Sequence, residues 1–300
     1  AGSPSAWISA GASSRTTSPD ILAEEFSKGI AGMEVLNNSG VFTVNPGLQA
    51  GIREVGNNVT VPYFESIGKA QSVPAGGALT PKKLTMSSET ATVLHLGDAV
   101  SVNGWAAKAK QTGRDVYEVA VEQLLAGFRA KLEDVMIDSI AARAVAASMV
   151  YDGGAAIVSS TCLTEGQKVF GDELMSNGGI RMWVMNSKPY WDLAGLADST
   201  GRPLMVQVPG EELLRLGGKP VMLSDRSGYL VPSTTPQQYY TLGAKANAGA
   251  VWFNGDVSIE MDKDILADDM VLAYHVYCVV HTYSVMPAGT KAGVGGFKSR

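Results

Sequence analysis

Two adjacent segments constrain the fold of this chain most. An extended, turn-interrupted stretch runs from Asn58 to Val102, and one long amphipathic helix pattern follows from about Arg114 to Ala147. Apolar and polar residues alternate at the start of the first segment, and prolines and glycines interrupt its middle, which predicts a hairpin with an irregular tip. A hairpin with so little apolar surface does not offset the entropy of ordering its own backbone. We therefore expect it to lie on a neighbouring structure.

The helix pattern carries a single apolar stripe. Its members recur at spacings of three to five residues, and the expected core residues of the helix are Val119, Leu124, Phe128, Leu132 and Val135. At 1.5 Å per residue this helix would be roughly 50 Å long. That length exceeds the usual helix of a globular domain and is typical of a rib that crosses a flat subunit.

The rest of the chain divides into an N-terminal segment, a middle block and a C-terminal block. Residues 1–57 begin with a stretch rich in Ser, Ala and Gly that has no core of its own, and a short helix is predicted after Ser18. Residues 151–249 alternate short strands and short helices with Gly or Pro turns. The combination of helical and strand patterns predicts an α+β fold.

The C-terminal block, residues 250–300, carries three local signals. Asn254-Gly255 favours the positive φ angles of a tight turn and predicts a hairpin between the strands on either side of it. Val271 to Val285 is apolar on both faces, which predicts a central strand. The glycine-rich run from Gly293 to Gly296 follows no motif and predicts a flexible tail.

Charge and cysteine content exclude several classes of function. Lys and Arg total 24 against 29 Asp and Glu, a net charge of −5, so any contact with nucleic acid would be local and weak. Cys162 and Cys278 fall in different predicted domains, which favours free buried thiols over a disulfide or a zinc cluster. No apolar stretch reaches the about 18 residues of a membrane span, so no membrane partner is expected.

The titratable residues predict no catalytic site, no cofactor and no metal ion. His275 and His281 lie six residues apart on one predicted strand. They would be roughly 20 Å apart and could not bind the same ion. His95 alternates with leucines on the return strand of the hairpin, which favours a side chain facing solvent or a partner over a general base. Gly217-Gly218-Lys219-Pro220 lacks the first glycine of a phosphate loop.

The order of these segments resembles the major capsid proteins of tailed bacteriophages, which share the Hong Kong 97-type fold. In that family an extended loop precedes a spine helix, and an axial domain interrupts the peripheral domain that carries the spine. The matching runs are, in chain order, Val61-Pro62-Tyr63-Phe64, Leu79-Thr80-Pro81-Lys82-Lys83-Leu84, Leu96-Gly97-Asp98-Ala99-Val100, the spine, Met182 to Leu193, Gly218-Lys219-Pro220-Val221 leading to Ser224-Asp225, Tyr239 to Ala244, and Val257 to Asp262.

The resemblance implies a division of the chain into four parts. These are an N-terminal arm with a short helix over 1–57, an extended loop over 58–102, a peripheral domain from 103–150 and 250–300 with its spine helix over 114–147, and an axial domain over 151–249.

The resemblance also implies a non-enzymatic subunit that assembles into an icosahedral shell around phage double-stranded DNA. Its partners would be copies of itself in pentamers and hexamers, a scaffolding protein, a portal, and a maturation protease or decoration protein, with weak non-specific contacts to packaged DNA. Assembly in the host bacterial cytoplasm would place it in the virion capsid. The expected inter-subunit residues are in the extended loop: Lys69, Pro74, Pro81, Lys82 and Lys83.

Two other functions stay open at this point. An encapsulin-like nanocompartment shell protein would use the same fold around a protein cargo. A metabolic enzyme with an atypical site within residues 151–249 would be a small soluble oligomer.

Overall fold

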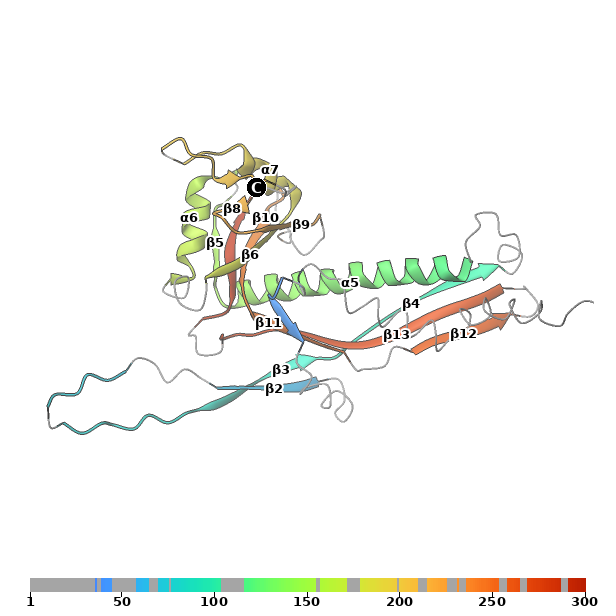
Figure 1. The fold of residues 1–300 in the computed structure, drawn as a ribbon, viewed down its shortest axis with the longest axis horizontal. Helices are drawn as coiled ribbons and strands as arrows, with labels where there is room; N and C mark the ends of the chain where they lie inside the picture. The colour runs from blue at the N-terminus through green and yellow to red at the C-terminus, as the bar shows by residue number, and fades with distance from the viewer. Residues whose placement is uncertain are drawn as a thin grey trace, which may run out of the picture.

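The main elements of the computed structural model are a long helix, two five-stranded sheets and a projecting hairpin (Figure 1). The structure describes residues 36, 39–44, 58–64, 70–75, 77–103, 116–154, 157–171, 179–198, 200–209, 215–225, 231, 236–253, 258–264, 269–286 and 291–300. The short helix predicted after Ser18 lies outside them. Among the described helices, none combines the length and apolar character needed to cross a membrane.

The predicted long helix is α5, Val116–Ala146, of 31 residues. It ends in a Schellman motif, in which the Met149 N–H donates to the Ala144 carbonyl and the Ser148 N–H donates to the Val145 carbonyl. Ser148 adopts the left-handed φ of 55° that this motif requires. The motif satisfies the last carbonyls of the helix and turns the chain directly into the strand that follows.

The first sheet carries α5 on one face. Its central strand β13 (Asp269–Thr282) pairs with β11 (Gly249–Phe253), β12 (Ser258–Asp264) and β4 (Leu94–Asn103), and β11 also pairs with β1 (Phe42–Val44). The 14-residue β13 is the central strand that the apolar run predicted. The ring of Phe128 on α5 meets Tyr274 on β13 edge to face, with centroids 5.8 Å apart.

The prediction of a hairpin at Asn254-Gly255 is wrong. Cys278 pairs with Phe253 of β11 and with Leu94 of β4, so these two strands flank β13 on opposite sides. Strand β12 also lies opposite β4, which places β11 and β12 along the same edge of β13, both antiparallel to it. The strands β11 and β12 therefore run in the same direction along one edge of β13 and do not pair with each other in the described part of the chain.

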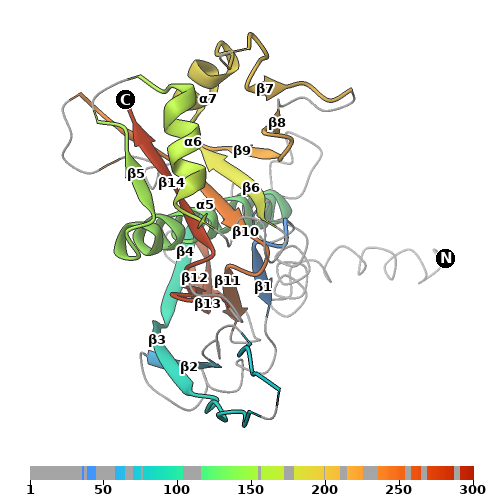
Figure 2. The same cartoon turned by 90° about the vertical axis from the view of Figure 1, so that its left-hand side faces the viewer.

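The second sheet forms the core of a separate block, shown above the end of α5 in Figure 2. Its strand order is β5 (Val150–Asp152), β14 (Val294–Ser299), β10 (Tyr239–Lys245), β6 (Ile180–Met185) and β9 (Val221–Leu223). Helix α6 (Ser160–Lys168) packs on β14. Helix α7 (Ser187–Ala194) and the small pair β7 (Met205–Val206) and β8 (Arg215–Leu216) complete the block.

The predicted flexible tail at Gly293 to Gly296 is also wrong, because most of it forms β14 inside the second sheet. A Cβ on Gly296 would lie 2.0 Å from the Thr241 carbonyl oxygen, and one on Gly295 would lie 2.9 Å from that of Met149. The glycines are therefore required by close backbone packing. Residues 250–300 consequently contribute strands to both sheets.

The projecting hairpin pairs β2 (Asn58–Phe64) with β3 (Met86–Thr92), from Asn58 opposite Thr92 to Phe64 opposite Met86. The return half of the hairpin predicted over 58–102 is in fact two strands, because β4 begins at Leu94 and joins the first sheet. The predicted extended loop thus includes a strand of the neighbouring sheet. The base of the hairpin lies against the sheet face opposite α5, which makes three layers at this point (Figure 1).

Candidate interaction surface: the hairpin tip and its anchor

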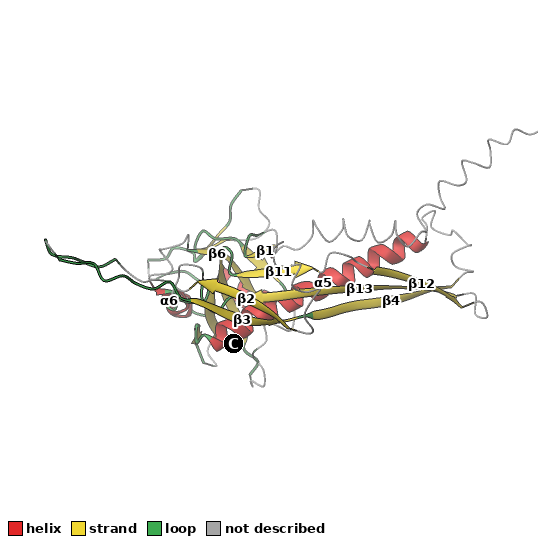
Figure 3. Cartoon of the chain, turned by 90° about the horizontal axis from the view of Figure 1, so that it is seen from below, coloured by secondary structure: helices red, strands yellow, loops and turns green. Residues whose placement is uncertain are grey.

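The hairpin buries its base and exposes its tip. A small apolar cluster holds the base, formed by Val59, Val61, Ala91, Ala250, Trp252 and Val279, all of them buried. Beyond it the chain projects away from the rest of the molecule without helix or strand over the described residues between Phe64 and Met86 (Figure 3). The same hairpin therefore contributes both to the core of its own subunit and to a free surface.

Large apolar side chains gather on the projecting part. Phe64 is 59% exposed, Leu79 71%, Leu84 61% and Met86 66%. Phe64 and Met86 are directly opposite each other at the end of the two strands. Several large exposed apolar side chains on one projecting segment make it a candidate surface for protein contact.

The predicted inter-subunit residues lie on the same segment. Pro74, Pro81, Lys82 and Lys83 are all exposed there, and Lys69 lies outside the described residues. The tip has some local order, since the Gln71 side chain donates from Nε2 to the Thr80 carbonyl at 2.9 Å and accepts the Thr80 N–H at 3.3 Å. Sequence reasoning missed the four apolar residues, although their size in an otherwise polar stretch was a usable signal.

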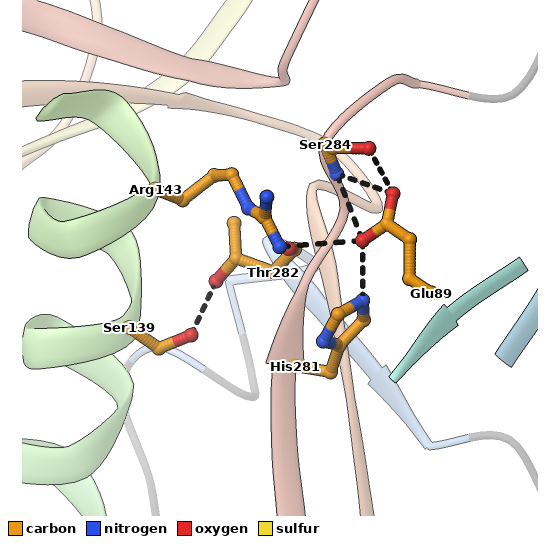
Figure 4. A network of polar contacts seen from close by, with 6 residues as sticks. All are labelled: Glu89, Ser139, Arg143, His281, Thr282 and Ser284. Carbon is orange, nitrogen blue, oxygen red and sulfur yellow. Dashed lines mark hydrogen bonds and ion pairs between the residues drawn. The ribbon is translucent and has the colours of Figure 1, made fainter. Parts of the chain in front are cut away.

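A polar cluster, here called the Glu89 clasp, ties the hairpin to both other layers (Figure 4). It consists of Glu89 on β3, Arg143 on α5, His281 on β13 and Ser284 just after β13. One Glu89 carboxylate oxygen, Oε2, lies 2.8 Å from Nε2 of His281 and 3.2 Å from an Arg143 guanidinium nitrogen. The other, Oε1, accepts the Ser284 N–H at 3.0 Å and also the Ser284 hydroxyl.

Two further hydrogen bonds link the helix to β13 beside the clasp. Arg143 donates from Nε to the Thr282 carbonyl at 2.9 Å, and the hydroxyls of Ser139 and Thr282 lie 2.8 Å apart. The Glu89 side chain is only 12% exposed, so its charge needs these donors to offset the loss of hydration. The clasp therefore fixes the hairpin with respect to α5 and the first sheet.

Burial dominates the electrostatics of the clasp. It lowers the pKa of His281, against the opposing effect of the Glu89 carboxylate, and the Arg143 charge lowers that pKa further. Burial together with Glu89 raises the pKa of Tyr283. The contact between His281 Nε2 and Glu89 Oε2 is a hydrogen bond in which an imidazole N–H donates to a carboxylate oxygen.

The predicted core residues of the helix are not all buried alike. Leu124, Phe128 and Leu132 are buried, whereas Val119 and Val135 are half-buried at the edge of the stripe. Met136, Ile137 and Ile140 continue the buried stripe instead. A straight helix of 3.6 residues per turn favours the i+4 series through Phe128 over the spacing that included Val135.

The remaining candidates for chemistry are dispersed. Cys162 on α6 and Cys278 on β13 are free and buried, and burial raises the pKa of Cys278 to about 12, which keeps it from acting as a nucleophile. Among the described residues, no group of three or more His, Cys, Asp or Glu side chains is placed to hold a metal ion.

Comparison with known proteins agrees with this geometry. The model of the Gp13-like family, described as major capsid protein 13-like, matches residues 63–276. A structure from Mycobacterium phage Bobi is 14% identical, with a TM-score of 0.61 over 87% of this chain and 90% of that chain. No curated protein matches.

Two further solved structures have the same fold. The capsid of Ralstonia phage GP4 is 10% identical, with a TM-score of 0.58 over 89% of this chain and 88% of that one. The Cyanophage Pam1 capsid asymmetric unit is 15% identical, with a TM-score of 0.55 over 90% of this chain and 91% of that one. The predicted α+β Hong Kong 97-type fold is thereby confirmed.

Proposed function

Because this chain belongs to the major capsid protein 13-like family and is a structural subunit of a phage capsid shell, we propose that its projecting hairpin joins neighbouring copies in that shell. Copies would form pentamers and hexamers of an icosahedral shell around double-stranded DNA. The block on the second sheet would form the axial domain around each symmetry axis. The hairpin would lie across the spine helix region of the next copy, and the N-terminal arm would latch beneath it.

The contrast within one hairpin carries this proposal. The clasp and the apolar cluster hold its base, whereas Phe64, Leu79, Leu84 and Met86 face solvent in the single subunit. At about 25 cal/mol per Å² of apolar area removed from water, covering these four side chains stabilises an assembly. Obligate interfaces between subunits bury more than about 2,000 Å² in total, so the hairpin would supply one part of a larger contact.

Other partners follow from the role of a shell subunit. A scaffolding protein and a portal would guide assembly in the host bacterial cytoplasm, and a maturation protease or decoration protein would act on the shell. Contact with packaged DNA would be weak and non-specific, in keeping with the net charge of −5. The family match favours this role over the encapsulin and enzyme alternatives.

Electron microscopy of an apolar-to-polar variant tests the hairpin contact. Leu79→Ser with Leu84→Ser should abolish regular shells and leave the melting temperature of the unassembled subunit unchanged, because both side chains are exposed. Leu79→Met with Leu84→Met is the matched control, since it keeps the apolar surface and should still assemble. Shells of normal size and yield from the serine variant would refute the proposed role of the hairpin.

A further inference from the structure

Two of the three histidines meet on the face of the first sheet that points away from α5. Nε2 of His95 on β4 and Nδ1 of His275 on β13 lie 3.0 Å apart. The ring of His95 is also stacked on Tyr277, with centroids 4.6 Å apart and an interplanar angle of 15°. Two paired strands and an aromatic neighbour therefore hold the imidazoles together before any ligand arrives.

Gly97 makes this close approach possible. It is directly opposite His275 in the pairing of β4 with β13. A Cβ on Gly97 would lie 3.1 Å from Nδ1 of His275 and 2.8 Å from the Tyr274 carbonyl oxygen. A side chain at this position would push the His275 imidazole away from β4 and from His95. The glycine thus leaves the space that the histidine pair occupies.

We infer that His95 and His275 form a binding site for a divalent transition-metal ion of the Zn²⁺ or Cu²⁺ class. Zinc–imidazole bonds are about 2.0–2.1 Å long, so two nitrogens on one ion at a tetrahedral angle are about 3.3–3.4 Å apart. The two nitrogens lie 3.0 Å apart as hydrogen-bond partners, and the two rings are stacked with centroids 5.1 Å apart. An ion would replace that hydrogen bond with one bond to each nitrogen, as the nitrogens move about 0.3–0.4 Å farther apart. His95 is exposed and His275 half-buried, so an ion can reach them.

The surroundings define the selectivity of this site. Imidazole nitrogens suit zinc, copper and nickel, whereas Mg²⁺ and Ca²⁺ require oxygen ligands. The Asp98 carboxylate, on the same strand as His95, lies on the opposite face, beside Tyr274 and Gly127 of α5. With two protein ligands in the described part of the chain, water or a side chain of another molecule completes the coordination.

Titration calorimetry and electron paramagnetic resonance test the site on the unassembled chain. Zinc chloride should bind with one ion per subunit, and magnesium chloride should not bind there. His95→Gln and His275→Gln should each weaken zinc binding by at least about 10-fold, the lower bound for losing even an outer partner of a ligand. Copper chloride should give a spectrum with coupling to two nitrogens. Tyr277→Phe is the control and should bind zinc like the parent, because it keeps the stacked ring and removes no ligand.

Three results would overturn the site: no saturable zinc binding by the parent chain, undiminished binding by either glutamine variant, or a copper spectrum with coupling to a single nitrogen at one ion per subunit. Both histidines are at the surface, so the variants should keep the parent melting temperature. If one does not fold, the copper spectrum of the parent still decides between two ligands and one.

Discussion

On one face of the first sheet, α5 covers β13 with a continuous buried stripe, and Phe128 meets Tyr274 edge to face. On the other face the hairpin base covers Trp252 and Val279, while Tyr277 and Val271, farther along β13, stay exposed. The α5 face is complete within one subunit. The hairpin face is complete only near the clasp, which leaves both the open sheet and the hairpin tip for contact with other molecules.

The comparison predicts that damage to the α5 face has the largest effect. Phe128→Asp should lower the free energy of unfolding by more than about 4 kcal/mol, because it leaves a cavity and buries a charge in a fully buried position. Chemical denaturation of the unassembled subunit would measure this loss of stability, and insolubility on expression would also reveal it. Phe128→Leu is the control and should lower the free energy of unfolding much less. A Phe128→Asp subunit with the parent's denaturation midpoint would mean that this face is not a core.

Damage to the clasp should have an intermediate effect on the hairpin face. Glu89→Gln should lower the free energy of unfolding by about 2 kcal/mol, because Arg143 and His281 lose their charged acceptor in a partly buried place. Hydrogen exchange should report the loss of protection in β2 and β3 more than in β13. Glu165→Gln, at the exposed pair with Lys168, is the control and should cost less than about 1 kcal/mol. Equal loss of protection in all strands would mean that the hairpin is not a separately anchored element.

The clasp also predicts a dependence of stability on pH. Burial lowers the pKa of His281, so the unfolded chain binds a proton at a higher pH than the folded one. Stability should therefore be complete above the unfolded pKa of about 6.5 and fall as the pH drops from there toward the folded pKa. Urea denaturation between pH 7.5 and 5 measures this decrease. His281→Gln should flatten it, and an unchanged slope in that variant would assign the decrease to other groups.

Charge reversal at the tip should have the smallest effect on the subunit. Lys82→Glu with Lys83→Glu should change the free energy of unfolding by less than about 0.5 kcal/mol, since both side chains are exposed. Assembly followed by light scattering should nevertheless weaken, and more at low salt than at high salt, because salt screens exposed charges. Lys82→Arg with Lys83→Arg should assemble normally. Equal loss of assembly at all salt concentrations would exclude an electrostatic role for the two lysines.

Local patterns in the sequence determined the elements whose own residues decide their form. The stripe through Leu124, Phe128 and Leu132 predicted the bounds of α5 to within two residues at its start and one residue at its end. The apolar run around Leu272 and Val276 determined that β13 is a central strand. These signals are strong because a long helix, or a strand paired along both of its edges, carries its apolar pattern along its own length.

Only the tertiary structure decided which distant residues meet. Asn254-Gly255 has the local signal of a hairpin, yet β11 and β12 both pair with β13, and the glycines of β14 support a packed strand rather than a tail. Glu89 meets His281 across 192 residues of chain. His95 meets His275 across 180 residues. No local pattern encodes such pairs, because their contact depends on the register of strands and the layering of the sheet, which the packing of the whole subunit determines.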